Sequence, residues 1–301
     1  MGSRVIIVGE GADDQVQVID ALLVARGCQV IRWDVGAWPG RQALSLTVGA
    51  PDPELDVARA WIRGVGLRPD EARFEAALRE HPYTLIEQLR ALRSLVRSCL
   101  RTLDARGVEL VNPLPTLGLG HLRPWQLRRL ADADVPVLPT LVTTDDAAAL
   151  AFVARHREVT LRPLIGGAAR IVRADAPAWV ARLEHAPAQL SVHRPGHALR
   201  AYVLAGEVIA AGRVHTDALE YRLGEHELER VEPEPAIAAA VVKAARLLGL
   251  TFAGVDVRVF DDGFAVHGLN PSPMFTGFDR LAGTDVAERL ADHLARPGRT
   301  R

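Results

Sequence analysis

Lysine is almost absent from this chain. Lys243 is the only lysine among 301 residues, and the other 35 of the 36 basic residues are arginine. Basic and acidic residues nearly balance, at 36 and 37, which gives a formal net charge of -1. A balanced chain has no overall attraction for nucleic acid or for an anionic membrane surface. We therefore expect neither of these as a partner.

Long apolar runs and paired cysteines are also missing. No run approaches the roughly 20 apolar residues of a membrane-spanning helix, and Met1–Val5 leads directly into a strand-like segment, so we expect no signal peptide. The two cysteines, Cys28 and Cys99, lie in apolar-periodic stretches without a recognisable partner spacing. Buried thiols in a reducing cytoplasm are predicted, in preference to a disulfide or a nucleophile.

The chain opens with a β-α-β pattern. Residues 4–9 form an apolar run closed by glycine, residues 13–26 carry apolar side chains at helical spacing, and residues 29–35 predict a second strand. The turn at 9–14 holds two of the three glycines of a dinucleotide fingerprint, but Asp14 fills the third position. Asp13 and Asp14 would also repel a pyrophosphate at the helix start. The pattern predicts an N-cap and a parallel Rossmann-like α/β sheet without a dinucleotide.

The remaining pattern divides the chain into an α/β first third and an α+β remainder. Strands are expected at 43–48, 57–63 and 108–112, and a helical stretch at 69–106 with a break near His81–Pro82. Beyond it, short strands in hairpin succession are expected at 158–164, 169–174, 189–193, 199–204, 207–214, 253–260 and 263–269. Further helices are expected at 124–133, from 145, and at 178–183, 235–248 and 285–294.

Several segments resemble a known family. Residues 253–257 (Ala-Gly-Val-Asp-Val), 269–273 (Leu-Asn-Pro-Ser-Pro) and 283–287 are similar to the C-terminal motif of RimK-type ATP-grasp ligases. Residues 199–213 resemble the strand pair that precedes this motif. The first third, with Trp33-Asp34 and Ala60-Trp61-Ile62-Arg63, resembles the maturases of graspetides (microviridin-type peptides), a class of modified ribosomal (RiPP) peptides.

The resemblance implies a fold and an activity. It implies a Rossmann-like pre-ATP-grasp domain at 1–112, followed by a two-lobed ATP-grasp region with a central lobe at 113–190 and a C-terminal lobe at 191–301. Such enzymes use ATP and Mg²⁺ to convert a carboxylate of a peptide or small molecule into an acyl phosphate, which a nucleophile then attacks. Relatives often form dimers, so a homo- or hetero-dimer is a further expectation.

The resemblance also assigns roles to individual residues. Its two phosphate-binding lysines correspond to Arg123 and Arg162, and its glycine-rich lid to Gly166 and Gly167. The Mg²⁺ ligands would be Asp256 and Asn270. Arg200 and Arg213, expected on one surface of neighbouring strands, would meet the acyl phosphate as catalytic residues.

The sequence departs from the family at four positions. Both lysines are arginine, the acidic hinge residue corresponds to Val192, and the middle metal ligand, a glutamate, corresponds to Gly268. Gly268 and Asn270 share a strand face, so His267 is expected to point away unless the strand bulges.

Two functions remain open on this basis. One is an active but divergent ligase in which arginine binds the phosphates. The other is a pseudoenzyme that keeps the ATP-grasp scaffold to bind a peptide or partner. Outside the resemblance, Asp256 and the two arginines could instead form structural ion pairs, and Asn270-Pro271 could be turn chemistry.

Overall fold

The computed structural model describes residues 3–38, 43–49, 55–66, 68–165, 168–175, 177–216 and 227–297. The chain divides into two compact units. Unit 1 comprises Met1–Pro115, Met274–Asp279 and Asp285–Arg301, and unit 2 comprises Thr116–Pro273 and Arg280–Thr284. Most of the last 28 residues belong to unit 1.

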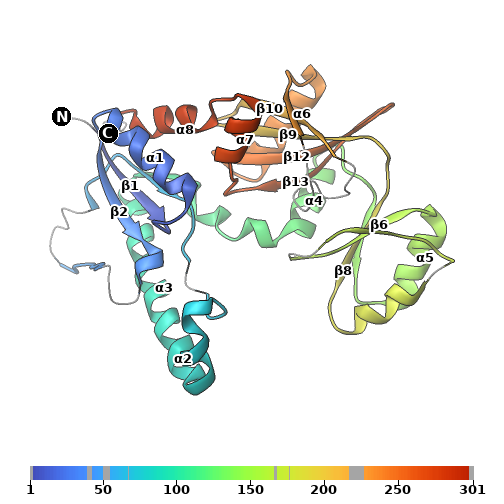
Figure 1. Ribbon diagram of the computed structural model, residues 1–301, viewed down its shortest axis with the longest axis horizontal. Coiled ribbons are helices and arrows are strands. Elements are labelled where there is room, and N and C mark those ends of the chain that lie inside the picture. Colours follow the sequence, from blue (N-terminus) through green and yellow to red (C-terminus); the bar gives the residue numbers. More distant parts are fainter. Residues whose placement is uncertain are drawn as a thin grey trace. The chain divides into compact units, whose positions relative to one another are not determined.

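Unit 1 is built on a parallel four-stranded sheet in the order β2-β1-β3-β4 (Figure 1). Its strands are β1 (Arg4–Gly9), β2 (Gln29–Asp34), β3 (Arg59–Ile62) and β4 (Glu109–Val111). Its helices are α1 (Asp14–Ala25), α2 (Glu75–Glu80), α3 (Pro82–Ala105) and α8 (Val286–Ala295). The β-α-β opening is confirmed, and so is the break at His81–Pro82. The predicted strand at 43–48 is wrong: the structure describes these residues as a loop, from which Leu44 and Leu46 reach the core.

The start of α1 shows why the turn before it carries two aspartates. Asp13 is the N-cap, and its carboxylate accepts a hydrogen bond of 2.7 Å from the backbone N–H of Gln15. The same carboxylate accepts a hydrogen bond of 2.9 Å from Arg63. These bonds confirm the predicted N-cap.

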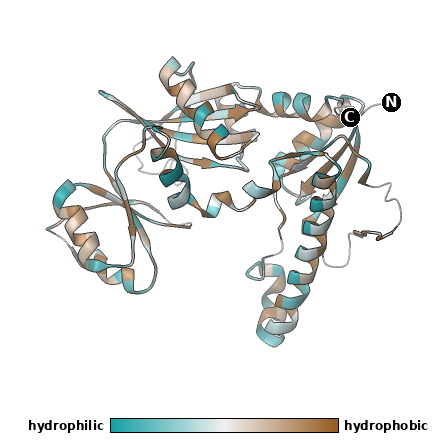
Figure 2. Cartoon of the chain, turned by 180° about the vertical axis from the view of Figure 1, so that it is seen from behind, coloured by the Kyte–Doolittle hydropathy of each residue, from teal (hydrophilic) through white to brown (hydrophobic). Residues whose placement is uncertain are grey.

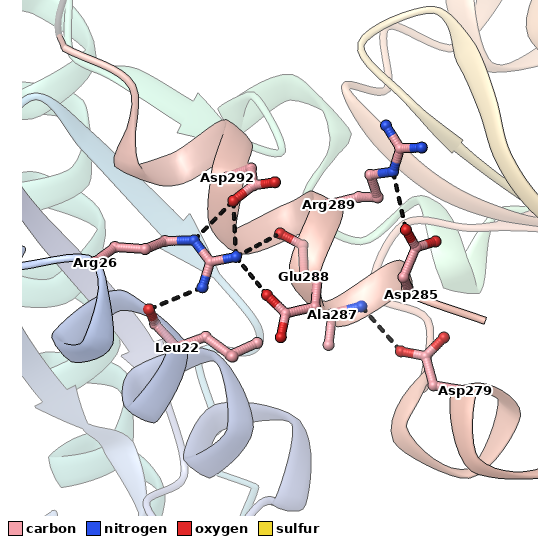
Figure 3. A network of polar contacts seen from close by, with 8 residues as sticks. All are labelled: Leu22, Arg26, Asp279, Asp285, Ala287, Glu288, Arg289 and Asp292. Carbon is pink, nitrogen blue, oxygen red and sulfur yellow. Dashed lines mark hydrogen bonds and ion pairs between the residues drawn. The ribbon is translucent and has the colours of Figure 1, made fainter. Parts of the chain in front are cut away.

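Helix α8 is fastened to α1 by an arginine (Figure 3). The guanidinium of Arg26 donates to the carboxylate of Glu288, to Asp292 at 2.7 Å and to the carbonyl oxygen of Leu22 at 3.0 Å. At the other end of α8, the carboxylate of Asp279 accepts hydrogen bonds of 2.9 Å from the backbone N–H groups of Val286 and Ala287. A carboxylate at a helix N-terminus satisfies free N–H groups and interacts favourably with the helix dipole.

Unit 2 contains two sheets. The first has the order β5-β8-β6-β7 and is made of β5 (Thr140–Thr143), β6 (Val159–Pro163), β7 (Arg170–Val172) and β8 (Ala188–Val192). Helix α5 (Asp146–His156) packs on it, with Ala149 and Val153 fully buried (Figure 1). The second has the order β11-β10-β9-β12-β13.

The second sheet is antiparallel throughout and carries the largest core of unit 2. Its strands are β9 (His197–Leu204), β10 (Glu207–His215), β11 (Glu227–Arg230), β12 (Phe252–Phe260) and β13 (Gly263–Asn270). The apolar side of α6 (Pro235–Leu247) and part of α4 (Arg123–Ala131) cover one face, which includes Ala201, Val203 and Val255. Both predicted hairpins, at 199–214 and 253–269, are confirmed.

The remaining elements are short. Helix α7 spans Thr276–Ala282, and 3-10 helices span Val35–Ala37, Ala72–Phe74, Leu114–Thr116, Leu119–His121 and Pro177–Glu184. Helix α3, the longest helix described at 24 residues, carries both hydrophilic and hydrophobic residues (Figure 2). Neither α3 nor any other helix in the described ranges has the length and apolar character needed to cross a membrane.

One buried cluster in unit 1 makes stability depend on pH. Glu109 accepts a hydrogen bond of 2.9 Å from Nε2 of His293 and one of 2.7 Å from Nε of Arg59. The bond from His293, aided by Arg59, lowers the pKa of Glu109 to about 2. The unfolded carboxyl titrates near 4.3, so the ionised form stabilises the fold above that pH. This stabilisation is lost as the pH falls through the folded pKa.

We predict that Glu109→Gln lowers the free energy of unfolding by about 1 kcal/mol at pH 7, a figure reduced for solvent screening because the Glu109 side chain is 40% exposed. Urea unfolding at a series of pH values should show the difference shrinking between roughly pH 4.3 and pH 2. The matched control is Glu87→Gln, at an exposed helix ion pair, which should change stability by less than about 0.5 kcal/mol. A Glu109→Gln deficit that stays constant from pH 7 to pH 3 would contradict the assignment.

Candidate functional site

A pocket in unit 2 is lined by residues from both of its sheets and from α4. Four arginines, two histidines and one carboxylate supply its charged and titratable groups: Arg123, Arg162, Arg194, Arg258, His193, His267 and Asp256. Small or apolar residues and two hydroxyls complete the lining: Leu138, Thr160, Ala169, Ser191, Val192, Ala198 and Val257. The structure therefore brings together Arg123, Arg162 and Asp256, which the sequence placed in one site.

Arg123 is positioned by its neighbour one helical turn later. Gln126 is buried, and its side-chain amide pairs with the backbone of Leu269: it accepts from the N–H at 3.0 Å and donates to the C=O at 3.2 Å. It also donates to the carbonyl of Leu119 at 2.7 Å. Since residues three apart share a helix face, this arrangement directs Arg123 toward β13. A Cβ built on Gly268 would lie 3.1–3.4 Å from the Arg123 guanidinium.

The hairpin of β12 and β13 contains a β-bulge at His267. Asp256 pairs with Gly268, but the next residue, Val257, pairs with Val266, so His267 is the extra residue on β13. The bulge brings His267 into the pocket lining, where its Nε2 lies 3.1 Å from Nη1 of Arg162. The exception allowed for His267 in the sequence analysis, a bulged strand, therefore applies, and this residue does not point away. Because a guanidinium only donates, Nε2 of His267 is the acceptor, and this ring is neutral here.

Gly268 has a backbone conformation that favours glycine, with φ of +154°. A side chain at this position would meet the Arg123 guanidinium as well. The glutamate that the resemblance expects at this position is thus opposed by the local backbone.

Asp256 is tied to a buried arginine. Arg200 is 4% exposed, and its Nη1 donates to Oδ1 of Asp256 at 2.7 Å. The guanidinium of Arg200 lies 5.2 Å from the ring centroid of Tyr202. It also occupies the space beside Gly254, because a Cβ built on that glycine would lie only 1.9 Å from Nη2 of Arg200. Glycine at 254 is what allows this ion pair to form inside the sheet.

Arg213 does not share a sheet face with Arg200. On the β9–β10 pair, Arg200 lies opposite Gly212, whereas Arg213 lies opposite Leu199. Directly paired residues share a sheet face and successive residues alternate, so Arg200 and Arg213 occupy opposite faces. Asp256, opposite Arg200, shares the face of Arg200. The prediction that both arginines serve one surface is wrong, because strand register was not visible in the sequence.

Burial in the pocket lowers the pKa values of two basic groups. Burial lowers the pKa of the Arg258 guanidinium. Burial also lowers the pKa of His193, and the charge of Arg258 lowers it further, despite the opposing effect of Glu158. An anion in the pocket would relieve this electrostatic penalty.

The oxygen ligands for Mg²⁺ are few. Asn270 lies opposite Gly254, so it shares a face with Asp256 as expected. Its Oδ1, however, accepts a hydrogen bond of 2.9 Å from the N–H of Ser272. Asp256 is the only carboxylate of the described lining and already accepts from Arg200. Within the described ranges no three His, Cys, Asp or Glu side chains come together as a metal site. This donor set fits a phosphate better than it fits Mg²⁺, which requires oxygen ligands in near-octahedral geometry. Gly166 and Gly167, predicted as the lid, lie outside the described residues.

We predict that Gly268→Ala lowers the free energy of unfolding by about 1–3 kcal/mol, mainly through backbone strain. The matched control is Gly277→Ala in α7, where a Cβ would meet nothing within 4 Å and which should be neutral or stabilising. Combining Gly268→Ala with Arg123→Ala should recover little stability, since the backbone sets the cost. Thermal unfolding of the variants measures this, and an unchanged Gly268→Ala midpoint would contradict the conformation assigned to Gly268.

Part of the chain matches a known protein family. The family described as RimK-like ATP-grasp domain matches residues 191–294. A probable alpha-L-glutamate ligase of Thioalkalivibrio sulfidiphilus is 36% identical over 111 residues, covering 35% of this chain and 37% of that protein. The tetrahydromethanopterin:alpha-L-glutamate ligase of Methanococcus maripaludis is 27% identical over 173 residues, covering 52% of this chain and 59% of that protein. The matches thus span 37–59% of the length of these two curated relatives.

Solved structures match over nearly the whole chain. The ATP-grasp ligase PsnB, in complex with a phosphomimetic variant of its minimal precursor, Mg and ADP, superposes with a TM-score of 0.84 at 28% identity, covering 96% of this chain and 97% of PsnB. A RiPP-associated ATP-grasp ligase of Chryseobacterium gregarium has a TM-score of 0.79 at 17% identity, with 99% of each chain covered, which shows the fold alone. Residues 191–294 are therefore similar to a RimK-like ATP-grasp domain, and the chain has the fold of the ATP-grasp ligase PsnB, which was solved in complex with a variant of its minimal precursor.

Proposed function

We propose that this protein is an ATP-grasp ligase that activates a carboxylate of a peptide or small molecule as an acyl phosphate. The observation that carries the proposal is the convergence of Arg123, from α4, and Arg162, from β6 of the other sheet, on one pocket. Two arginines from separate elements facing one cavity suit a polyphosphate, which each guanidinium binds in a bidentate manner. A peptide substrate is supported by the structural similarity to PsnB, which was solved in complex with a variant of its minimal precursor.

The residues have distinct roles in this proposal. Arg123 and Arg162 bind the phosphates, and His267 orients Arg162. Arg200 touches Asp256 from within the sheet and is absent from the pocket lining, so it acts as a positioning residue. The parallel sheet of unit 1 would be the pre-ATP-grasp domain. The lid glycines Gly166 and Gly167 and a metal role for Asp256 and Asn270 stay predictions.

The chemistry transfers the γ-phosphoryl group of ATP to a carboxylate oxygen, and ADP leaves. An amine or hydroxyl then attacks the acyl carbon, loses its proton, and expels inorganic phosphate, which forms an amide or an ester. The arginines assist by stabilising the charge that develops on the phosphoryl oxygens.

A second candidate, a non-catalytic scaffold that binds a peptide or partner, is favoured by one specific observation. The single carboxylate of the described pocket lining is hydrogen-bonded to Arg200, and Gly268 provides no second one. A site that binds nucleotide without turning it over would have these properties. ATP binding without ADP formation, across a panel of peptides and small carboxylates, would select the scaffold.

We predict that Mg²⁺-ATP binds the wild-type protein with Kd below about 1 mM in calorimetric titration, which corresponds to about 4 kcal/mol. Arg162→Ala should weaken binding at least tenfold, and Arg162→Lys should lose less because it keeps the charge. The control is Arg155→Ala, an exposed arginine on α5 of the same unit that does not line the pocket. Wild-type affinity in Arg162→Ala, or equal losses in Arg162→Ala and Arg155→Ala, would overturn the proposed site.

A further inference from the structure

Arginine side chains outnumber carboxylates in the described lining of the pocket. We propose that it binds the polyphosphate of a nucleotide directly through arginine, with the guanidinium of Arg123 supplying positive charge that a metal ion would otherwise supply. The inference rests on the proposed nucleotide site and specifies how that site neutralises its ligand.

The first support is the balance of charge. Four arginines and one carboxylate belong to the described lining of the pocket. Of these arginines, Arg194 forms an ion pair with Asp262 and stacks on Phe260. The one carboxylate of the described lining, Asp256, is itself bonded to a fifth, buried arginine, Arg200. A divalent cation entering this pocket would meet like charge, and a polyphosphate would meet opposite charge.

The second support is the position of Arg123. The Gln126–Leu269 amide pair fixes α4 on β13, and the Arg123 guanidinium then lies over Gly268. Gly268 pairs with Asp256, so a cation bound to Asp256 on this face would lie close to that guanidinium. The φ of +154° at Gly268 disfavours a carboxylate side chain that could offset both charges. The backbone therefore supports a fixed guanidinium here in place of a second acidic ligand.

The third support is the state of His267. The bulge brings this ring into the pocket, where a neutral imidazole could be a metal ligand. Its Nε2 instead accepts the hydrogen bond from Arg162, which uses the lone pair that a metal would need. The ring thus orients a second guanidinium toward the same ligand.

These arrangements predict how metal affects affinity. Mg²⁺ bound to ATP removes two negative charges from the ligand, so an arginine-only site should bind the free nucleotide at least as tightly as the Mg²⁺ complex. Inorganic tripolyphosphate should compete, because the contacts are to phosphate. Affinity should also fall as the salt concentration rises.

The test is calorimetric titration of ATP into the full chain, once with EDTA and once with excess MgCl₂, at matched ionic strength and pH. We expect the Kd in EDTA to equal that in MgCl₂ within about threefold or to be lower, and tripolyphosphate to displace ATP in EDTA. A Kd at least tenfold higher in EDTA than in MgCl₂ would overturn the inference while leaving the nucleotide site intact. Absence of binding in both buffers would overturn the proposed function as well.

An arginine variant adds a readout that a purely structural role would not change. Arg123→Gln should weaken ATP binding at least tenfold in EDTA and make the remaining binding stimulated by Mg²⁺. The matched control is Arg129→Gln, an exposed arginine on the same helix that does not line the pocket, which should bind like the wild type in both buffers. Equal losses in EDTA and MgCl₂ for Arg123→Gln would contradict the substitution of a guanidinium for a metal. Should this variant fail to fold, the wild-type comparison alone decides.

Discussion

The pairing of the Gln126 amide with the backbone of Leu269 is the interaction on which the site depends. It satisfies both backbone groups of a buried strand residue and anchors α4 against β13. Buried polar groups must be paired, and an unpaired one costs on the order of 1–3 kcal/mol. The position of Arg123 follows from this anchor, since the two side chains are three residues apart on α4. Without it, the side chain that lies over Gly268 would have no fixed direction.

The β12–β13 hairpin determines the rest of the pocket. Regular pairing from Gly254 to Asp256 brings Asp256 and Asn270 to one face, and the single extra residue beyond Asp256 brings His267 into the pocket as well. Arg200 can lie in the same sheet only because Gly254 leaves room for its guanidinium. The glycines at 254 and 268 therefore have different functions: one makes space for an ion pair, and the other allows a strained backbone next to an arginine.

Much of the fold could be predicted from the sequence, because some sequence patterns specify their structure locally. The apolar run before Gly9, the break at His81–Pro82 and the hairpin turn at Asp261–Gly263 each specify their structure within a few residues. Arg123, Arg162 and Asp256 were placed in one site by resemblance, and the structure brings them to one pocket.

What could not be predicted depends on contacts between distant segments. The side of the sheet that Arg213 faces follows from register with β9, and the bulge at His267 from register with β12. The apolar residues at 43–48 have strand-like composition but lie in a loop, and α7 carries too short a pattern to detect. The docking of α8 on α1 depends on Arg26, 262 residues before Glu288.

In the proposed site, two arginines from different elements bind one polyphosphate. The most direct measurement is a crystal structure of the protein soaked with a non-hydrolysable ATP analogue in the presence of EDTA. The account predicts phosphate oxygens within about 3 Å of the guanidinium nitrogens of both Arg123 and Arg162. A nucleotide seated elsewhere, or in the pocket with its phosphates turned away from both arginines, would contradict it.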